Sequence, residues 1–156
     1  MSIGSARKVT DPRERVTMEQ ARQSAINGQG QTQDLLRFNA LNRSHATGGL
    51  GGLPIVRSAR GMVDPQVGEM NAISERLTPQ ERQQGSGAMS DRDVEMYRRT
   101  VPGLGYLGNA NTNIINSRLA GIRRSQDYSA FLEEYARVNG TITGATERWM
   151  QYSQDN

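Results

Sequence analysis

The sequence predicts an all-α protein of several short helices and one long or bent helix, with an extended, glycine-rich N-terminal arm. Three observations lead to this prediction. Apolar residues recur at three- and four-residue steps through most of the second half of the chain. Helix-capping patterns precede several of these runs. Only 35% of the residues are hydrophobic and 17 are glycine, so the chain is too polar to bury its whole length in one core.

Charge and composition divide the chain into two expected parts. Residues 1–63 form an arginine-rich, partner-dependent arm with a glycine-rich linker, and they carry nine basic and four acidic residues. Residues 64–156 form a helical module with ten basic and twelve acidic residues. Every basic residue except Lys8 is arginine, which suits interfaces, ion pairs and phosphate contacts better than lysine does. The excess positive charge is therefore assigned to the first part.

Two short helices are expected in the first part. The first begins at Asp11-Pro12, where a capping residue precedes proline, and ends at the stop signal Asn27-Gly28. A Gln- and Gly-rich run over 29–33 separates it from a second helix over 34–41, in which Leu, Phe and Leu are three residues apart. Residues 44–54 hold four glycines in five positions and predict a flexible connector. The weak apolar stripe of the first helix consists of Val16, Ala21, Ala25 and Ile26.

Three helix starts are expected between residues 64 and 100. Asp64-Pro65 begins a helix with apolar residues at three- and four-residue steps. The pattern over 78–81 is that of a capping box, and it begins a helix of about two turns. Ser90-Asp91 begins another helix, which ends near Thr100 because Pro102 disfavours a helical residue before it. The apolar positions of the first of these helices are Val67, Met70, Ile73 and Leu77.

The longest helix is expected over residues 110–138. Its polar segment 123–127 shifts the phase of the apolar stripe, which is compatible with one bent helix or with two helices that meet near Ser125. Asn139-Gly140 is a helix-stop signal, and a last short helix begins at Thr143. The stripe before the shift is Ile115, Leu119 and Ile122, and the one after it is Tyr128, Phe131, Tyr135 and Val138.

Residues that could carry catalysis are sparse. The chain has no cysteine, and its one histidine, His45, lies in the flexible connector. Among the carboxylates, Asp91 and Asp93 fit first-turn caps, and Glu133-Glu134 fits the polar face opposite the aromatic stripe. No spacing of residues typical of zinc or calcium ligands is present. The sequence therefore predicts a protein that is not an enzyme and has no catalytic residue, metal site or cofactor.

The arginines suggest binding. Five arginines of the first part are predicted to contact nucleic acid or an acidic protein surface: Arg7, Arg13, Arg15, Arg57 and Arg60. The aromatic residues lie in the near-neutral part at helical spacing, where they resemble a core more than a stacking surface. Arginine there, as in Arg98-Arg99 and Arg123-Arg124, is assigned mainly to ion pairs.

The N-terminus and the hydropathy profile bear on location. The residues after Met1 lack the apolar run of a secretory signal peptide, and no run approaches the roughly 18 apolar residues of a membrane-spanning helix. We therefore expect synthesis in the cytoplasm, with membrane contact only inside an assembly.

The order of landmarks between Asp64 and Tyr152 resembles a known module. This module is the C-terminal one found on tailed-bacteriophage DNA-ejection proteins, also called internal virion or DNA-transfer proteins, and on phage virion-associated murein hydrolases. The landmarks are Leu77-Thr78-Pro79, Gln84-Gly85-Ser86-Gly87-Ala88-Met89-Ser90-Asp91-Arg92-Asp93, Met96-Tyr97, Val101-Pro102-Gly103-Leu104, Asn111-Thr112-Asn113-Ile114-Ile115, Tyr128-Ser129-Ala130-Phe131-Leu132-Glu133-Glu134-Tyr135, Asn139-Gly140-Thr141-Ile142-Thr143-Gly144-Ala145 and Trp149-Met150-Gln151-Tyr152.

The resemblance implies a structural role in a virus particle. Such proteins occupy the capsid interior or the portal and tail, assemble with portal, tail or other ejection proteins, and help viral genome ejection through the host envelope. The chain is further expected to form a homo-oligomeric ring with copies of itself and to contact viral DNA. The residues expected to carry folding and docking are Gly85, Gly87, Ser90, Asp91, Tyr97, Pro102, Phe131, Tyr135, Gly140, Trp149 and Tyr152. The alternative left open by the sequence is a cytoplasmic nucleic-acid-binding regulatory protein.

Overall fold

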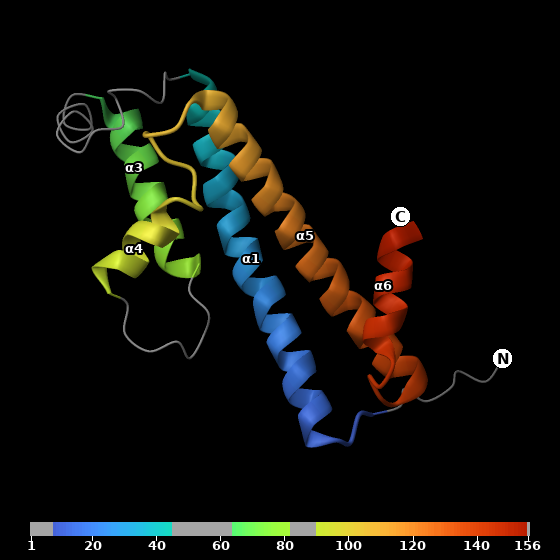
Figure 1. Ribbon diagram of the computed structural model, residues 1–156. Helices are drawn as coiled ribbons and strands as arrows, with labels where there is room; N and C mark the ends of the chain where they lie inside the picture. The colour runs from blue at the N-terminus through green and yellow to red at the C-terminus, as the bar shows by residue number, and fades with distance from the viewer. Residues whose placement is uncertain (1–7, 45–63, 82–89, 156) are drawn as a thin grey trace. The chain divides into compact units, whose positions relative to one another are not determined.

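The computed structural model describes residues 8–44, 64–81 and 90–155, with the side chains of residues 80, 81, 154 and 155 left out. These residues form five α-helices and a 3-10 helix, without a strand, which confirms the all-α prediction (Figure 1). The predicted glycine-rich connector and His45 lie outside the described residues. The helices in chain order are α1 (Pro12–Ser44), α3 (Pro65–Leu77), the 3-10 helix η2 (Thr78–Glu81), α4 (Asp91–Arg98), α5 (Gly108–Asn139) and α6 (Ala145–Asp155).

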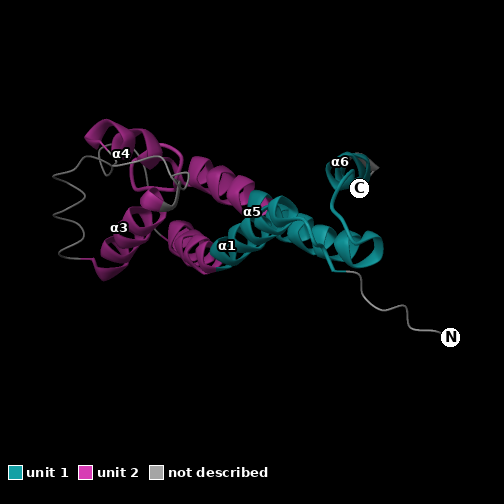
Figure 2. Ribbon diagram, turned by 90° about the horizontal axis from the view of Figure 1, so that it is seen from below, with its two compact units in different colours: residues 1–29, 121–156 teal, residues 30–120 magenta. Residues whose placement is uncertain are grey.

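The chain forms two compact units (Figure 2). Unit 1 comprises residues 1–29 and 121–156, and unit 2 comprises residues 30–120. Helix α1 contributes residues 12–29 to unit 1 and residues 30–44 to unit 2. Helix α5 contributes residues 108–120 to unit 2 and residues 121–139 to unit 1. The boundary expected at residue 63 adjoins the segment 45–63, which is outside the described residues.

The stop predicted at Asn27-Gly28 is wrong, because α1 continues through it to Ser44 as one helix. A glycine ends a helix when it adopts a positive φ, but Gly28 is helical and buried. A Cβ atom built on Gly28 would lie 2.8 Å from Cγ2 of Ile122 on α5. This glycine therefore allows α1 and α5 to approach closely within unit 1. It is needed for helix packing and does not end the helix.

Two glycines of α1 are expected to respond in opposite directions to alanine. Gly28→Ala should lower the free energy of unfolding by about 1–2 kcal/mol, because the overpacking cost of roughly 1–3 kcal/mol against Ile122 exceeds the gain in helix propensity. Gly30→Ala should raise it by about 0.5–1 kcal/mol, because a Cβ atom there meets nothing within 4 Å. Urea denaturation measures the free energy of unfolding of both variants. A change of the same sign in both would contradict the close approach of Gly28 to Ile122.

The core of unit 2 is built from the second segment of α1 (residues 30–44), helix α3, the segment 101–104 and the first turns of α5. Asp64 caps α3: its Oδ1 accepts from the backbone N–H of Gln66 at 3.0 Å and of Val67 at 3.4 Å. The predicted apolar stripe of α3 is confirmed, since every member is buried. The buried apolar side chains of this unit are Leu35, Phe38, Leu41, Val67, Met70, Ile73, Leu77, Val101, Pro102, Leu104 and Ile115.

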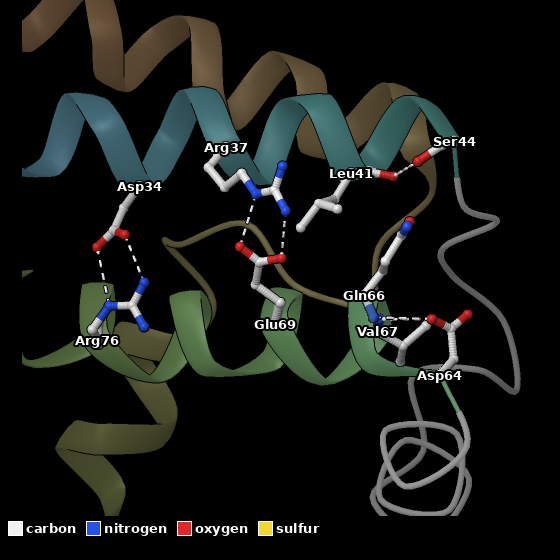
Figure 3. A network of polar contacts seen from close by, with 9 residues as sticks. All are labelled: Asp34, Arg37, Leu41, Ser44, Asp64, Gln66, Val67, Glu69 and Arg76. Atoms are coloured by element: carbon white, nitrogen blue, oxygen red, sulfur yellow. Dashed lines mark hydrogen bonds and ion pairs between the residues drawn. The ribbon is translucent and has the colours of Figure 1, made fainter.

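Two reciprocal ion pairs join α1 to α3 beside this core (Figure 3). The guanidinium of Arg37 on α1 donates two hydrogen bonds of 2.7 Å to Glu69, and that of Arg76 on α3 donates two to Asp34. Each helix supplies one arginine and one carboxylate, which fixes the antiparallel alignment of the two helices. Both arginines are more than half exposed, whereas Glu69 and Asp34 are half-buried, so the pairs contribute to register more than to stability.

Helices η2 and α4 correct one prediction and confirm another. Within the described residues, the pattern at Thr78 forms a 3-10 continuation of α3 and not the start of an α-helix, and the Thr78 hydroxyl donates backwards to the carbonyl of Ser74 at 2.8 Å. The rest of the helix predicted there lies outside the described residues. The start at Ser90 is confirmed as a capping box: Ser90 Oγ accepts from the Asp93 N–H, and the Asp93 carboxylate accepts from the Ser90 N–H at 2.9 Å. Its helix α4 buries no residue fully.

Helix α5 runs unbroken from Gly108 to Asn139, so of the two expected possibilities the chain adopts one helix. In unit 1 its buried positions are Ser129, Leu132 and Ala136, and Ala145 of α6 joins them. The aromatic stripe predicted for this segment lies beside these buried positions. The stop at Gly140 is confirmed by its φ of 74°.

Candidate interaction surface

Five aromatic side chains gather where α6 packs against the C-terminal part of α5 in unit 1. We call them the aromatic cluster: Tyr128, Phe131, Tyr135, Trp149 and Tyr152. The Trp149 ring lies 5.4 Å from the rings of Tyr128 and Phe131 and 5.7 Å from that of Tyr152, centroid to centroid. Phe131 also contacts Tyr135, at 5.8 Å. The cluster holds five of the eight aromatic residues of the chain, so it is the main concentration of aromatic surface.

The aromatic cluster is not a buried core. None of its members is fully buried, and Tyr152 is 56% exposed. The buried face of α5 passes through Ser129, Leu132 and Ala136, so Tyr128, Phe131 and Tyr135 lie at its margin. The interpretation of these rings as core, made from their helical spacing, is therefore wrong in this respect. Tyr and Trp side chains that remain partly accessible are typical of protein interfaces.

The turn between α5 and α6 sets the position of α6 and hence of Trp149. Gly140 and Gly144 both adopt positive φ, 74° and 79°, which glycine tolerates best. The Tyr135 hydroxyl donates to the carbonyl of Thr143 at 3.1 Å. This bond fixes one ring of the cluster against the turn, so the exposed aromatic surface stands on an ordered support.

Glu14 of α1 binds the same turn. Its carboxylate accepts hydrogen bonds from the hydroxyls of Thr141 at 2.6 Å and of Thr143 at 3.0 Å. These donors, the Thr141 hydroxyl foremost, lower the pKa of Glu14 below its ordinary value of 4.5, although partial desolvation acts in the opposite direction. The ionised carboxylate is therefore the form that holds the turn.

Acid is expected to loosen this contact. Because the folded-state pKa of Glu14 is depressed, its contribution to stability is present above pH 4.5 and is lost as the pH falls through the folded value. Glu14→Gln should lower Tm at pH 7, and its difference from the wild type should shrink as the pH falls below 4.5. Circular dichroism melts between pH 7 and 3 measure this, with Glu19→Gln, an exposed position on the same helix, as the control. A difference independent of pH would contradict the assignment.

A groove runs beside the aromatic cluster. It has a volume of about 390 Å³ and is lined by Phe131 and Tyr135 of α5 and by Arg148, Gln151 and Tyr152 of α6. Arg148 is its one charged lining residue, and this guanidinium is exposed, with no hydrogen-bond or ion-pair partner in the described part of the chain. The groove thus combines flat apolar walls with an available cation and an amide.

The predicted arginine contacts are distributed differently. Arg13 is exposed at the start of α1, whereas Arg15 donates to the backbone carbonyls of Val9 at 3.1 Å and Thr10 at 3.2 Å and so holds the segment that precedes the helix. The other three, Arg7, Arg57 and Arg60, lie outside the described residues. In unit 2 the preference of arginine for ion pairs is confirmed for Arg98, which pairs with Glu75 at 2.8 Å.

The residues predicted to carry docking separate into two sets. Phe131, Tyr135, Trp149 and Tyr152 come together in the aromatic cluster, next to the turn that begins at Gly140. Four others belong to unit 2: Ser90 caps α4, Asp91 is exposed, Tyr97 is half-buried and Pro102 is buried. Gly85 and Gly87 lie outside the described residues.

Part of this surface was not predicted from the sequence. Tyr128, Arg148 and Gln151 were not predicted as site residues, although Tyr128 precedes Phe131 by three positions and Arg148 precedes Trp149 by one. The helical spacing of Tyr128, Phe131 and Tyr135 was the available signal. The contact of Glu14 with Thr141 joins residues 127 positions apart and had no local signal.

The described residues show neither a membrane-spanning helix nor a metal-binding cluster. No helix among them combines the length and the apolar character needed to cross a bilayer. The same residues contain no group of three or more His, Asp or Glu side chains placed to hold a metal ion.

Comparison of the chain with models of protein families, with curated proteins and with solved structures gives no significant match.

Proposed function

We propose that this chain is a structural virion protein of a tailed bacteriophage, a DNA-ejection (internal virion) protein. It assembles at the portal or tail, inside or against the capsid, and assists genome delivery through the host envelope. Its role is binding and assembly without catalysis or a cofactor. Its partners are portal, tail or other ejection proteins and further copies of itself, with viral DNA as an additional contact.

The observation that carries the proposal is the order of landmarks between Asp64 and Tyr152, which resembles the module of phage ejection proteins. Several landmarks coincide with structural features that such a module would need. Ser90 caps a helix, Asn139-Gly140 ends α5, and the half-buried Trp149 and the exposed Tyr152 form part of the aromatic cluster. The landmarks therefore mark turns, caps and a surface, which is the pattern of an assembly module.

The modest core of unit 1 also favours a partner-dependent protein. Among the described residues of this unit, the buried hydrophobic side chains are Leu132, Ala136 and Ala145, and two of these are alanines. Large apolar side chains on the same unit are exposed, including Val16, Ile26 and Val138. Helices with so little buried apolar area depend on further packing for stability. Assembly with other virion proteins would supply it.

Mass spectrometry of purified particles tests the proposal. Particles of the phage that encodes the chain are purified on a density gradient, and the copy number of the chain is measured relative to the portal protein. We expect a fixed number of copies per particle, in a ratio compatible with a ring. Absence from intact particles, with the chain present in the infected cell, would overturn the proposal.

A salt titration separates this function from that of a cytoplasmic nucleic-acid-binding regulator. A regulator would bind duplex DNA as the free protein, with an affinity that falls steeply as salt rises. For the virion protein we expect only weak DNA binding by the purified chain, measured by fluorescence anisotropy. Tight, salt-dependent binding together with absence from particles would establish the regulator instead.

A further inference from the structure

The groove beside the aromatic cluster has the composition of a protein-binding hot spot. Its walls are Phe131, Tyr135 and Tyr152, and Trp149, which does not line the groove, contacts Phe131 and Tyr152 with ring centroids at 5.4 and 5.7 Å. Trp, Tyr and Arg are the residue types enriched at the energetic centres of protein interfaces. The volume of about 390 Å³ is at the small end of the roughly 300–1,000 Å³ range of ligand pockets, which suits an anchoring side chain.

The charge around the groove decides between a nucleic acid and a protein. Single-stranded nucleic acid binds where aromatic rings line a strongly basic channel. Residues 121–155 carry four arginines and five carboxylates, so the segments that build the groove are not basic overall. Arg137 pairs with Glu134, so the charge of this cation is balanced within unit 1, and Arg124 donates a long hydrogen bond to Ser153 Oγ at 3.5 Å. A protein partner fits this balance better.

Arg148 specifies the chemistry of that partner. A partner that covers the groove removes water from this guanidinium, which has no counter-ion in the described part of the chain. A buried cation without a partner is strongly destabilising, whereas a carboxylate can accept two parallel hydrogen bonds from it. The occupant must therefore carry a carboxylate beside the apolar side chain that enters between the rings.

We propose that this groove is a docking site for a segment of another protein in which an aromatic or long aliphatic anchor is flanked by an acidic residue. The anchor lies against Phe131, Tyr135 and Tyr152, and the carboxylate pairs with Arg148. Gln151, the remaining lining residue, offers an amide to the backbone of the segment. The inference rests on the proposed function only in assuming that the protein that carries this segment belongs to the virus particle.

Trp149 provides the readout, because it is the one tryptophan of the chain and it contacts two rings of the groove. The full chain is titrated with a synthetic peptide in which Leu and Phe are flanked by Glu, and with the same peptide carrying Gln in place of Glu. Excitation at the red edge of the tryptophan band avoids the peptide. We expect a saturable change in Trp149 fluorescence and about tenfold tighter binding of the acidic peptide, as one charge-assisted contact predicts.

Matched variants assign the contacts. Arg148→Gln should remove the preference for the acidic peptide, and Tyr152→Ala should weaken both peptides. Arg123→Gln, an exposed arginine on α5 that does not line the groove, should change neither affinity. Far-UV circular dichroism checks that each variant keeps the helical content of the wild type.

Three results would overturn the inference: no saturable response to the acidic peptide at millimolar concentration, equal affinity for the two peptides, or tighter binding of a short oligothymidylate. The last would assign the groove to nucleic acid. Each of these results is independent of whether the chain is found in purified particles. If the peptide does not bind but the chain is present in particles, only the docking groove is rejected. If the peptide binds but the chain is absent from particles, only the virion function is rejected.

Discussion

Replacing Phe38 with alanine is expected to lower the free energy of unfolding of unit 2 by about 3–5 kcal/mol. Phe38 is 0% exposed on the second segment of α1, within the apolar core of this unit. Truncation loses the transfer free energy of the ring and leaves a cavity. Since native domains are stable by only about 5–15 kcal/mol, the change removes a large share of the total.

Leu36 provides the matched control for Phe38. It lies two residues away on the same helix but is 52% exposed. Leu36→Ala should change stability by less than about 0.5 kcal/mol, because alanine also favours the helix. Urea denaturation followed by far-UV circular dichroism, which reports helical content, compares the two variants. Equal losses would show that α1 does not pack in the register described.

Local patterns in the sequence predicted the elements whose signals are local. Asp64 before Pro65 predicted the start of α3, and the three- and four-residue steps from Val67 to Leu77 predicted its buried face. The capping box at Ser90 and the stop at Gly140 were correct for the same reason. Caps and amphipathic stripes depend on residues within one or two turns, so the sequence contains all the information they need.

Elements whose signals depend on tertiary contacts were not predicted. Gly28 follows asparagine and so resembles a helix stop, but its lack of a side chain accommodates Ile122, which is 94 positions away. The weak apolar stripe predicted for the first helix does not form a buried face, since Val16 and Ile26 are both more than half exposed. Local propensity gives way where a helix is stabilised by what it packs against.

The candidate site was predicted in its residues more than in its environment. Four of the five members of the aromatic cluster were named from the sequence, because aromatic spacing is visible there. Their exposure depends on which face of α5 packs against the rest of unit 1. Leu132 and Ala136 lie on that buried face, so the aromatic rings lie beside it. Arg148 gains its significance from the groove that α5 and α6 form together, and the sequence alone does not show that the two helices meet there.

A buried hydrogen-bond network around Asn111 carries the other large expected effect. Asn111 is 0% exposed on α5 in unit 2. Its Oδ1 accepts from the Gly103 N–H at 2.9 Å, and its Nδ2 donates to the Gly103 carbonyl at 3.0 Å and to Asn42 Oδ1 at 3.2 Å. Asn42 in turn donates to the Gly108 carbonyl at 2.9 Å. One side chain thus satisfies both backbone groups of a loop residue and ties α1 to it.

Asn111→Ala is expected to lower the free energy of unfolding by about 2–4 kcal/mol, because it leaves the Gly103 N–H and carbonyl and the Asn42 amide oxygen without these partners in a buried site. Asn111→Asp keeps the volume but places a carboxylate against two acceptors, so its loss at pH 7 should be at least as large. Asn113→Ala, an exposed position on the same helix, should change stability by less than about 0.5 kcal/mol. Retention of stability by the aspartate variant would show that packing volume, and not hydrogen bonding, makes Asn111 necessary.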